Sequence, residues 1–518
     1  MAISVMADIL REHGREHGER IALHYKGREW TYQDCDRNSN QVAQALIGAG
    51  VGPGDRIAYI DKNTPEYFSI LFGGVKVNAV LVAVNWRLAP REMEFILNDS
   101  ESKVLIIGEE FLGHLAEIKP ELKHLEKVVV LGSSDEYEAF EDWVAAQPAE
   151  DPMVPASGSD VCFQLYTSGT TGLPKGVELT NDNVFSVLPI ASEEWTFDES
   201  TVNLVCMPVF HIAGSFVGVL GLYNGVKNIL IRDVDPVEIL RLIPEHGITL
   251  SFFVPAILQF MLMVPGVEQT DFSSLQSIIY GASPITNEVL VKSMETFKCD
   301  FMQVYGLTET TGIVTRLRAE DHDPDGPKAD LLRSAGTPWS DIKLRIIDPL
   351  GHDLPDGEVG EIWIKTQQNM KGYWKQPEAT AEAFPENGWF TSGDAGYLKD
   401  GYLYIHDRVK DMIISGGENI YPAEIENVLM DHDQVADVAV IGVPDDKWGE
   451  AVKAIVVKEQ GTDLSEEELI SYCRERLAHF KCPSTVNWAE ALPRNPSGKL
   501  LKKELREPYW KDQERRVH

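Results

Sequence analysis

The run Tyr-Thr-Ser-Gly-Thr-Thr-Gly-Leu-Pro-Lys-Gly, at residues 166–176, constrains the fold and chemistry of this chain more than any other stretch. Glycine lets a backbone turn so that successive N–H groups point into one concavity, which suits an anion. Small hydroxyl side chains add neutral donors there, and a lysine adds positive charge. The run therefore predicts a polyphosphate-binding loop lined by Thr167, Ser168, Gly169, Thr170, Thr171, Gly172 and Lys175.

Two other interpretations of the run fit less well. A P-loop requires Gly-Lys followed directly by Ser or Thr, whereas here Pro174 precedes the lysine and Gly176 follows it. A flexible linker would not lie between two elements of one core. The residues before the run, 161–166, are typical of a short buried strand, and Asn181 shortly after it predicts a helix cap.

Strands and helices alternate in the N-terminal part of the chain. Strand-like runs at 56–60, 79–84 and 103–107 are separated by helical patterns that begin at Thr64-Pro65 and at Arg91. Repeated alternation of this kind implies a parallel α/β sheet. The 518 residues also exceed what one hydrophobic core usually supports, so we expect at least two domains.

The C-terminal part follows different patterns. From Gly336 onward the spacing of glycine and proline shortens, which indicates an antiparallel β segment with hairpin turns. Past Arg408 the pattern becomes that of a small α+β unit, whose helix begins with a capping box at Ser465 and Glu468. We place the domain boundary near Lys410.

Charge and composition exclude several classes of protein. The net charge of −34 argues against a nucleic-acid binder, which needs a basic face. The six cysteines include no Cys-x-x-Cys pair, which argues against a metal cluster or disulfide framework and fits a reducing cytosol. The first 20 residues carry charges throughout, unlike a secretory signal. The most apolar window, 67–86, is broken by Lys76 and Asn78, so we expect no membrane span.

Several further polar residues have ordinary interpretations when each is taken alone. His211 lies among apolar residues, where a lone histidine is usually a satisfied core residue. Thr308 has the place of a helix cap, and Asp394 follows a glycine, as turn residues often do. Lys499 lies close to other basic residues near the C-terminus, where a lysine is usually solvated.

The segments that contain these residues resemble, in the same order and over essentially the whole chain, the motifs of the adenylate-forming superfamily. This superfamily comprises acyl-CoA synthetases, adenylation domains of peptide synthetases and beetle luciferases. The matching segments beyond the phosphate run are Pro208–Gly214, Gly281–Ser283, Tyr305–Thr311, Thr391–Asp394, Asp407–Lys410, Gly416–Glu426 and Pro493–Lys499.

The resemblance implies how a nucleoside would be bound. Tyr305 would stack on adenine, and Asp394 and Arg408 would bind the ribose hydroxyls. Ser392 stands where relatives have threonine but keeps the hydroxyl. The adenine-binding turn would consist of Gly281, Ala282 and Ser283, the last at a position where relatives more often have alanine.

Catalytic roles follow from the same resemblance. Thr308 would contact the α-phosphate, and Glu309 would hold Mg²⁺, for which a hard carboxylate oxygen is a suitable ligand. Lys499 would bond the substrate carboxylate and the α-phosphate, where its ammonium would stabilise developing charge. His211 would line the carboxylate pocket. Relatives that activate amino acids carry aspartate there, so its absence argues against an amino-acid substrate.

The resemblance also concerns CoA and chain length. Gly416 and Gly417 would let the pantetheine arm of CoA pass close to the backbone, and Lys410 would be the hinge of a rotating C-terminal domain. Short-acid relatives carry tryptophan where Gly306 stands, which predicts a deeper acyl pocket here. A tight turn that requires glycine is the alternative explanation of Gly306.

We therefore expect an α/β fold with a large N-terminal domain, residues 1–409, which holds parallel sheets and a β-rich subdomain. A small mobile α+β domain, residues 410–518, would follow it. The predicted enzyme is an ATP-dependent acyl-CoA synthetase that uses Mg²⁺ and converts a medium- to long-chain fatty acid, ATP and CoA to acyl-CoA, AMP and pyrophosphate. We expect a cytoplasmic protein without a nucleic-acid partner, while peripheral membrane contact and a homodimer stay open.

Three alternatives to this function remain. An aryl or other bulky carboxylate–CoA ligase differs only in the acid. An acyl-AMP ligase that loads a carrier protein would resemble relatives with an insertion that hinders CoA, and no extra segment is visible here. A non-catalytic nucleotide-binding paralogue should have lost Lys499 or Glu309, and both are present.

Overall fold

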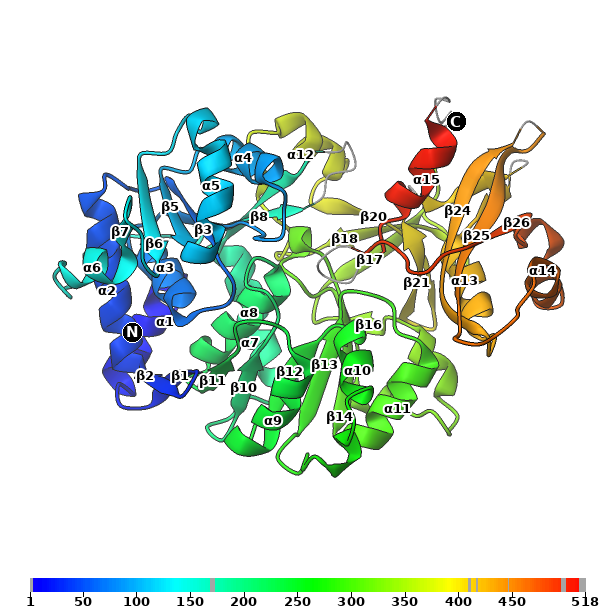
Figure 1. Cartoon of the computed structure of the whole chain (residues 1–518), viewed down its shortest axis with the longest axis horizontal. Coiled ribbons are helices and arrows are strands. Elements are labelled where there is room, and N and C mark those ends of the chain that lie inside the picture. The colour runs from blue at the N-terminus through cyan, green and yellow to red at the C-terminus, as the bar shows by residue number, and fades with distance from the viewer. Residues whose placement is uncertain are drawn as a thin grey trace.

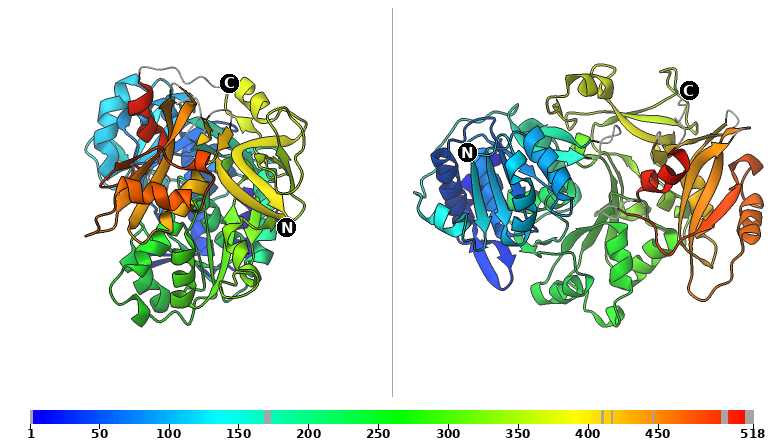
Figure 2. Two further views of the ribbon diagram at one scale, coloured as in Figure 1. Left: turned by 90° about the vertical axis from the view of Figure 1, so that its right-hand side faces the viewer. Right: turned by 45° about the horizontal axis from the view of Figure 1, so that its top comes forward.

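The structure is a computed structural model that describes residues 3–167, 173–408, 411–415, 418–445, 447–494 and 500–511. Two large α/β sheets, a smaller antiparallel sheet and a C-terminal α+β unit make up the fold (Figure 1). The first sheet lies at one end of the long axis and the C-terminal unit at the other (Figure 2). This arrangement confirms the predicted fold class.

The first sheet has eight strands in the described chain. The strands from β8 to β7 pair in parallel, whereas β9 runs antiparallel to both of its neighbours, β8 and β19, at one edge. Every residue of β3, β4 and β5 is buried, because these apolar strands are covered on both faces. In spatial order the strands are β19 (Gly372–Tyr373), β9 (Lys175–Thr180), β8 (Val161–Thr167), β4 (Val80–Ala83), β3 (Arg56–Ile60), β5 (Val104–Gly108), β6 (Lys127–Leu131) and β7 (Glu138–Ala139).

Within the described ranges the second sheet has nine strands, of which β2, β15 and β16 are antiparallel to their neighbours. Its N-terminal hairpin, β1 and β2, joins strands from the middle of the chain. In spatial order the strands are β16 (Thr337–Pro338), β15 (Thr315–Leu317), β14 (Asp300–Tyr305), β13 (Ser277–Gly281), β12 (Leu250–Phe253), β10 (Val202–Val205), β11 (Lys227–Leu230), β1 (Ile21–Tyr25) and β2 (Arg28–Thr31).

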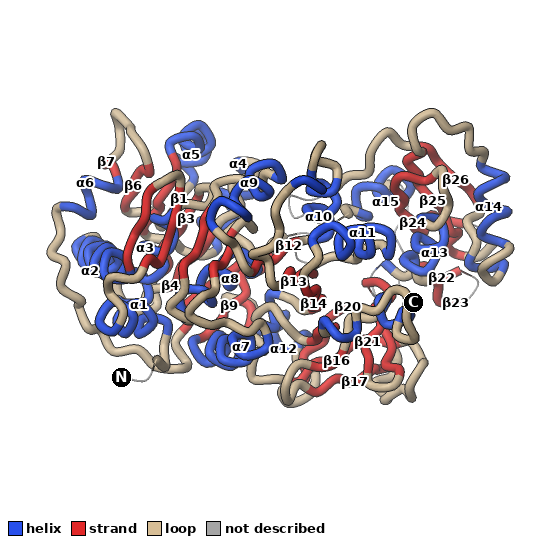
Figure 3. The backbone as a smooth tube through the Cα atoms, turned by 90° about the horizontal axis from the view of Figure 1, so that it is seen from below, coloured by secondary structure: helices blue, strands red, loops and turns tan. Residues whose placement is uncertain are grey.

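Helices flank the strands of both large sheets, as the view in Figure 3 shows. One continuous hydrophobic cluster contains side chains from both sheets and from the helices between them, so the two sheets share a core. The helices of this part are α1 (Met6–Glu16), α2 (Tyr32–Gly48), α3 (Pro65–Lys76), α4 (Pro90–Asp99), α5 (Leu112–Ile118), α6 (Phe140–Ala145), α7 (Asn181–Glu194), α8 (Ile212–Tyr223), α9 (Pro236–His246), α10 (Pro255–Leu262), α11 (Asn287–Phe297) and α12 (Pro377–Ala383).

The antiparallel sheet and the C-terminal unit complete the fold. The antiparallel sheet consists of β17 (Lys343–Ile347), β18 (Gly360–Lys365), β20 (Trp389–Lys399) and β21 (Tyr402–Arg408). The C-terminal unit has its own hydrophobic cluster between its sheet and helices. Its elements are β22 (Ile413–Ser415), β23 (Glu418–Ile420), α13 (Pro422–Met430), β24 (Val435–Asp445), β25 (Gly449–Lys458), α14 (Glu466–Arg474), β26 (Thr485–Trp488) and α15 (Lys502–Trp510). The boundary between residues 409 and 410 stays a prediction.

Local signals in the sequence set most helix starts. Thr31 caps α2. As predicted, Ser465 accepts a hydrogen bond from the N–H of Glu468 at the start of α14. The predicted cap at Asn181 is wrong by one residue, because the hydroxyl of Thr180 accepts the capping bond. Among the described helices, none has the length and apolar character that crossing a membrane requires.

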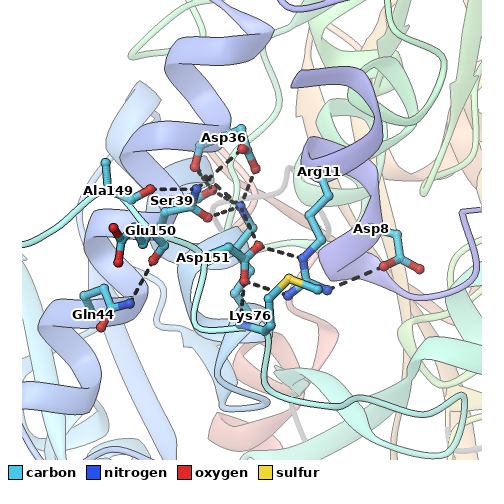
Figure 4. Close-up of polar contacts among 11 residues, drawn as sticks. Asp8, Arg11, Asp36, Ser39, Gln44, Lys76, Ala149, Glu150 and Asp151 are labelled. Carbon is cyan, nitrogen blue, oxygen red and sulfur yellow. Dashed lines mark hydrogen bonds and ion pairs between the residues drawn. The ribbon is translucent and has the colours of Figure 1, made fainter. Parts of the chain in front are cut away.

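A buried lysine joins the first helices to the segment that leads into β8 (Figure 4). Lys76, on α3, has no exposed surface, and its ammonium donates to the carboxylate of Asp36 and the amide oxygen of Asn40 on α2. Asp151 lies 3.8 Å away and pairs with Arg11 of α1. A buried ammonium needs such acceptors, because unpaired charge in a core is strongly unfavourable.

Lys76→Met should lower the free energy of unfolding by on the order of 3 kcal/mol, because buried acceptors lose their donor. Urea unfolding would measure the change. The matched control is Lys103→Met, whose ion pair with Asp55 is 33% and 26% exposed and should matter by less than about 1 kcal/mol. Equal losses of unfolding free energy in the two variants would show that the buried Lys76 network contributes no more than an exposed ion pair.

Candidate active site

The phosphate run joins two strands of the first sheet. Strands β8 and β9 pair antiparallel, and Thr167 at the end of β8 is the register partner of Lys175 at the start of β9. These two residues therefore hold the ends of the predicted loop side by side. The other predicted loop residues lie outside the described residues, and they are Ser168, Gly169, Thr170, Thr171 and Gly172.

Glu309, the predicted metal ligand, lies where the two large sheets meet. It belongs to a short 3-10 helix, Thr308–Thr310, that follows β14 of the second sheet. Its Oε1 accepts hydrogen bonds from the Thr167 and Tyr373 hydroxyls, each at 3.2 Å. The ammonium of Lys175 lies 4.8 Å from the centre of the Tyr373 ring. We call β8, β9 and the phosphate run between them the phosphate hairpin. The fold thus brings this hairpin together with the second predicted nucleotide motif, residues 305–311.

The donor set at Glu309 fits Mg²⁺. A carboxylate and a threonine hydroxyl are hard oxygen donors, which this ion prefers. Residues 3–511, apart from the gaps given above, contain no group of three or more His, Cys, Asp or Glu suited to a metal. Mg²⁺ held by one carboxylate and by substrate phosphates needs no such group. Glu309 and Thr167 would therefore hold the ion together with a bound triphosphate.

Residues 366–374, which we call the strap, fasten these parts to one another. The strap contributes β19, which pairs with β9 beside the phosphate hairpin. The N–H of Met370 donates to the carbonyl of Glu309 at 2.8 Å, and the Thr311 hydroxyl donates to a strap carbonyl at 2.7 Å. The side-chain amide of Asn183, on α7, donates to two more strap carbonyls. The strap therefore holds both the phosphate hairpin and the 305–311 motif.

Sequence reasoning did not identify the strap. Its aromatic pair, Tyr373-Trp374, was the available signal. Trp374 stacks on the Arg56 guanidinium, 3.4 Å from the ring centre, and its indole N–H donates to the carbonyl of Asp99. Arg56 in turn bonds Glu178 of β9 at 2.7 Å. A search for phosphate-binding residues passes over such aromatic anchors, because their role depends on distant partners.

Tyr305 and Asp394, the predicted adenine and ribose residues, contact each other. Tyr305 ends β14 and Asp394 lies in β20, yet the Tyr305 hydroxyl donates to Asp394 Oδ2 at 2.7 Å. The backbone of Asp394 is opposite that of Arg408 across β20 and β21. The side chain of Arg408 lies outside what the structure describes. The second sheet and the antiparallel sheet therefore meet at the predicted nucleoside site.

The predicted adenine turn follows β13, next to β14. A Cβ on Gly281 would lie 2.1 Å from the carbonyl oxygen of Val304, so only glycine fits this close approach. Ala282 has a backbone φ of +68°, in the left-handed region that residues other than glycine rarely adopt. Ser283 follows directly. The turn thus lies beside the end of β14, which carries Tyr305.

His211 differs from a satisfied core histidine. It immediately precedes α8, and its buried Nε2 has no hydrogen-bond partner among the described residues. Burial lowers the pKa of His211 to about 4, and the charge of Arg87 acts in the same direction. The imidazole is therefore neutral near pH 7, with one buried nitrogen available to a ligand.

Gly306 is required by the backbone itself. A Cβ at this position would lie 2.1 Å from the carbonyl oxygen of Gly312 and 2.9 Å from the nitrogen of Ile313. The tight-turn explanation therefore accounts for this glycine, and its presence carries no information about pocket depth. Gly312 also lies beside Ile212, so the 305–312 segment is adjacent to the start of α8.

Four more predicted residues share the status of the five loop residues. Lys410, the predicted hinge, lies outside the described residues, as do Gly416 and Gly417 of the predicted CoA tunnel and Lys499, the predicted catalytic lysine. Their roles stay predictions.

Comparison with known proteins decides the family. The profile described as "AMP-binding enzyme" matches residues 10–374, and that of the "AMP-binding enzyme C-terminal domain" matches residues 424–499. The chain belongs to the adenylate-forming superfamily. Within this superfamily it is an AMP-forming acid–thiol ligase of the group that acylates CoA or acyl carrier protein.

Three relatives illustrate this group. A fatty acid–[acyl-carrier-protein] ligase, ScoC of Streptomyces coeruleorubidus, is 40% identical over 98% of this chain and 96% of its own length. A feruloyl-CoA synthase of Amycolatopsis sp is 38% identical over 94% of this chain and 96% of its own. The solved structure of a Mycobacterium tuberculosis fatty acyl CoA synthetase is 35% identical, covers 99% of each chain and superposes with a TM-score of 0.80.

His211 should make the stability of this adenylate-forming ligase depend on pH. An unfolded histidine has a pKa near 6.5, so between pH 6.5 and 4 the unfolded state binds a proton that the folded state does not. Stability therefore falls as pH falls through this window. Replacing the ring with His211→Phe should remove this loss, so the variant should gain about 2 kcal/mol relative to wild type between pH 8 and pH 5.

Urea unfolding at the two pH values would measure this gain. His352→Phe, at a side chain that is 72% exposed, is the control and should track the wild-type protein. A constant difference between His211→Phe and wild type at both pH values would contradict the buried neutral state.

Proposed function

We propose that the protein is an ATP-dependent acyl-CoA synthetase, which joins a carboxylic acid to CoA through an acyl-adenylate. The observation that carries this proposal is the contact of Glu309 with Thr167 and Tyr373. It unites a phosphate hairpin with a carboxylate suited to Mg²⁺. The neighbouring contact of Tyr305 with Asp394 supports a nucleoside site a few residues away.

In the first step the substrate carboxylate attacks the α-phosphorus of ATP. A phosphorus–oxygen bond forms to the acid, and the bond to the bridging oxygen breaks, so pyrophosphate leaves. The hairpin amides and Lys175 would hold the departing phosphates, and Thr308 would contact the α-phosphate. Mg²⁺, when bound, neutralises charge on the triphosphate. Lys499 would stabilise the charge that develops at the α-phosphorus.

His211 would orient the acid during this step. Its imidazole is neutral near pH 7 and can keep a proton on Nε2, which is buried and has no partner in the described structure. That N–H would donate to a substrate carboxylate oxygen. A neutral donor orients the carboxylate without reducing its nucleophilicity as strongly as a full positive charge would.

In the second step the CoA thiolate attacks the acyl carbon, and AMP leaves. We infer that the C-terminal unit rotates about Lys410, which would withdraw Lys499 and bring in Gly416 and Gly417 beside the pantetheine arm. The separate hydrophobic core of the C-terminal unit supports such rigid-body motion.

The proposed acid is a medium- to long-chain fatty acid. Phe210 and Ile212 flank His211, which suits an apolar tail, and two of the relatives named above are a fatty acid ligase and a fatty acyl CoA synthetase. The feruloyl-CoA synthase supports an aryl acid as the alternative. The carrier-protein ligase aligns along 96% of its length, so the lack of an extra segment here does not exclude a carrier protein as acceptor.

An acid panel would test this proposal. Pyrophosphate exchange into ATP should depend on the acid, and kcat/KM should rise about fourfold for each added methylene until the pocket is full. A thiol-consumption assay with CoA or with an acyl carrier protein would then identify the acceptor. Preference for acetate would contradict the proposed acid, and acylation of the carrier protein alone would contradict the proposed acceptor.

Lys499→Ala should separate the two steps. Acyl-AMP formation should fall by about 10²-fold or more, because the ammonium acts on charge that develops only in the first transition state. Thioester formation from supplied acyl-AMP should be largely spared. Lys503→Ala, at an exposed lysine on α15, is the control and should leave both steps intact. Equal loss in both half-reactions would contradict the two-state mechanism.

A further inference from the structure

We propose that the Tyr305 hydroxyl sets the orientation of the Asp394 carboxylate and so makes the site selective for ribose over deoxyribose. The inference rests on the proposed function, in which Asp394 binds the ribose diol. Stacking on adenine would need only the ring of Tyr305. The hydroxyl makes a separate contact, donating to Asp394 Oδ2 at 2.7 Å. That contact links residues 89 positions apart.

The backbone around Asp394 is already fixed by other contacts. The N–H of Asp394 donates to the Ser392 hydroxyl at 3.0 Å, and that hydroxyl donates to the carbonyl of Ile362 at 2.7 Å. Gly393 between them has φ of +68°, which suits glycine. These contacts hold the backbone of Asp394, so the direction of its carboxylate depends on the contacts that its side chain makes.

Tyr305 restricts that rotation. Asp394 is only 6% exposed, so its carboxylate exchanges little with solvent and depends on protein donors. A hydrogen bond from a hydroxyl to a carboxylate is short and strong, and it favours one rotamer. The carboxylate that results can face a vicinal diol, whose two O–H groups need acceptors with fixed directions. Tyr305 would thus be a positioning residue for ribose recognition.

Tyr305→Phe tests the proposal, because it keeps the ring and removes the hydroxyl. Binding of ATP, 2′-deoxyATP and 3′-deoxyATP would be measured by calorimetry, alongside the KM and kcat of pyrophosphate exchange. We expect the Kd and KM for ATP to rise about tenfold, as for loss of a hydrogen bond to a charged group, while kcat changes little. The preference for ATP over the two deoxynucleotides should fall by a similar factor.

The structure offers a matched control in Tyr402→Phe. The Tyr402 hydroxyl also donates to an aspartate, Asp321, at 3.2 Å, but neither residue belongs to the nucleotide motifs. This variant loses the same kind of bond and should keep the wild-type preference for ATP. Similar melting temperatures of the two variants would show that any difference in nucleotide binding is not a folding effect.

A double variant provides the second test. In an Asp394→Ala background the hydroxyl has no carboxylate to orient, so adding Tyr305→Phe should weaken ATP binding by less than about twofold. An undiminished tenfold effect would overturn the proposal, as would a Tyr305→Phe variant that keeps its preference for ATP over deoxynucleotides. If the wild-type protein binds no ATP at all, the proposed function fails and this inference fails with it.

Discussion

One carboxylate oxygen, Oε1 of Glu309, is the point on which the nucleotide site depends. It accepts hydroxyl hydrogen bonds from Thr167 of the first sheet and from Tyr373 of the strap, while Glu309 itself lies in the short 3-10 helix that follows β14 of the second sheet. Because the two sheets share one hydrophobic core, this junction is held by packing on both sides. The strap adds backbone bonds to the same motif, so the position of Glu309 does not rely on a single contact. A site built in this way is arranged before any ligand arrives.

Lys499, the predicted catalytic lysine, and Gly416 and Gly417 of the predicted CoA loop fall in the C-terminal part of the sequence. Residues 3–408 hold the two large sheets and the antiparallel sheet, whereas the C-terminal unit packs around Ile413, Ile425 and Leu469. The nucleotide site around Glu309 therefore lies among the N-terminal sheets. The groups proposed to replace one another between the two reactions, Lys499 and the glycine loop, belong to the C-terminal part of the sequence. This division fits a mechanism in which the nucleotide stays in place and its neighbours change.

Local rules explain how much of this could be predicted from the sequence. The strand-like runs of β3 to β5 and the cap at Ser465 depend on near neighbours, and they were predicted well. The strap and the pairing of Tyr305 with Asp394 join residues far apart in sequence, so no local pattern encodes them. Gly306 was open to two explanations, and only the carbonyl of Gly312 in three dimensions distinguishes them.

The interleaved order of the strands has a consequence for synthesis of the chain. The second sheet takes its outer hairpin, β1 and β2, from residues 21–31, and the first sheet takes its last strand, β19, from residues 372–373. A nascent chain that has emerged only as far as residue 300 thus lacks strands of both sheets and leaves the edge of β9 uncovered. Exposed edges invite pairing with other chains. Neither sheet can be released from the ribosome as a finished half, so the large domain must mature as one body, late in translation.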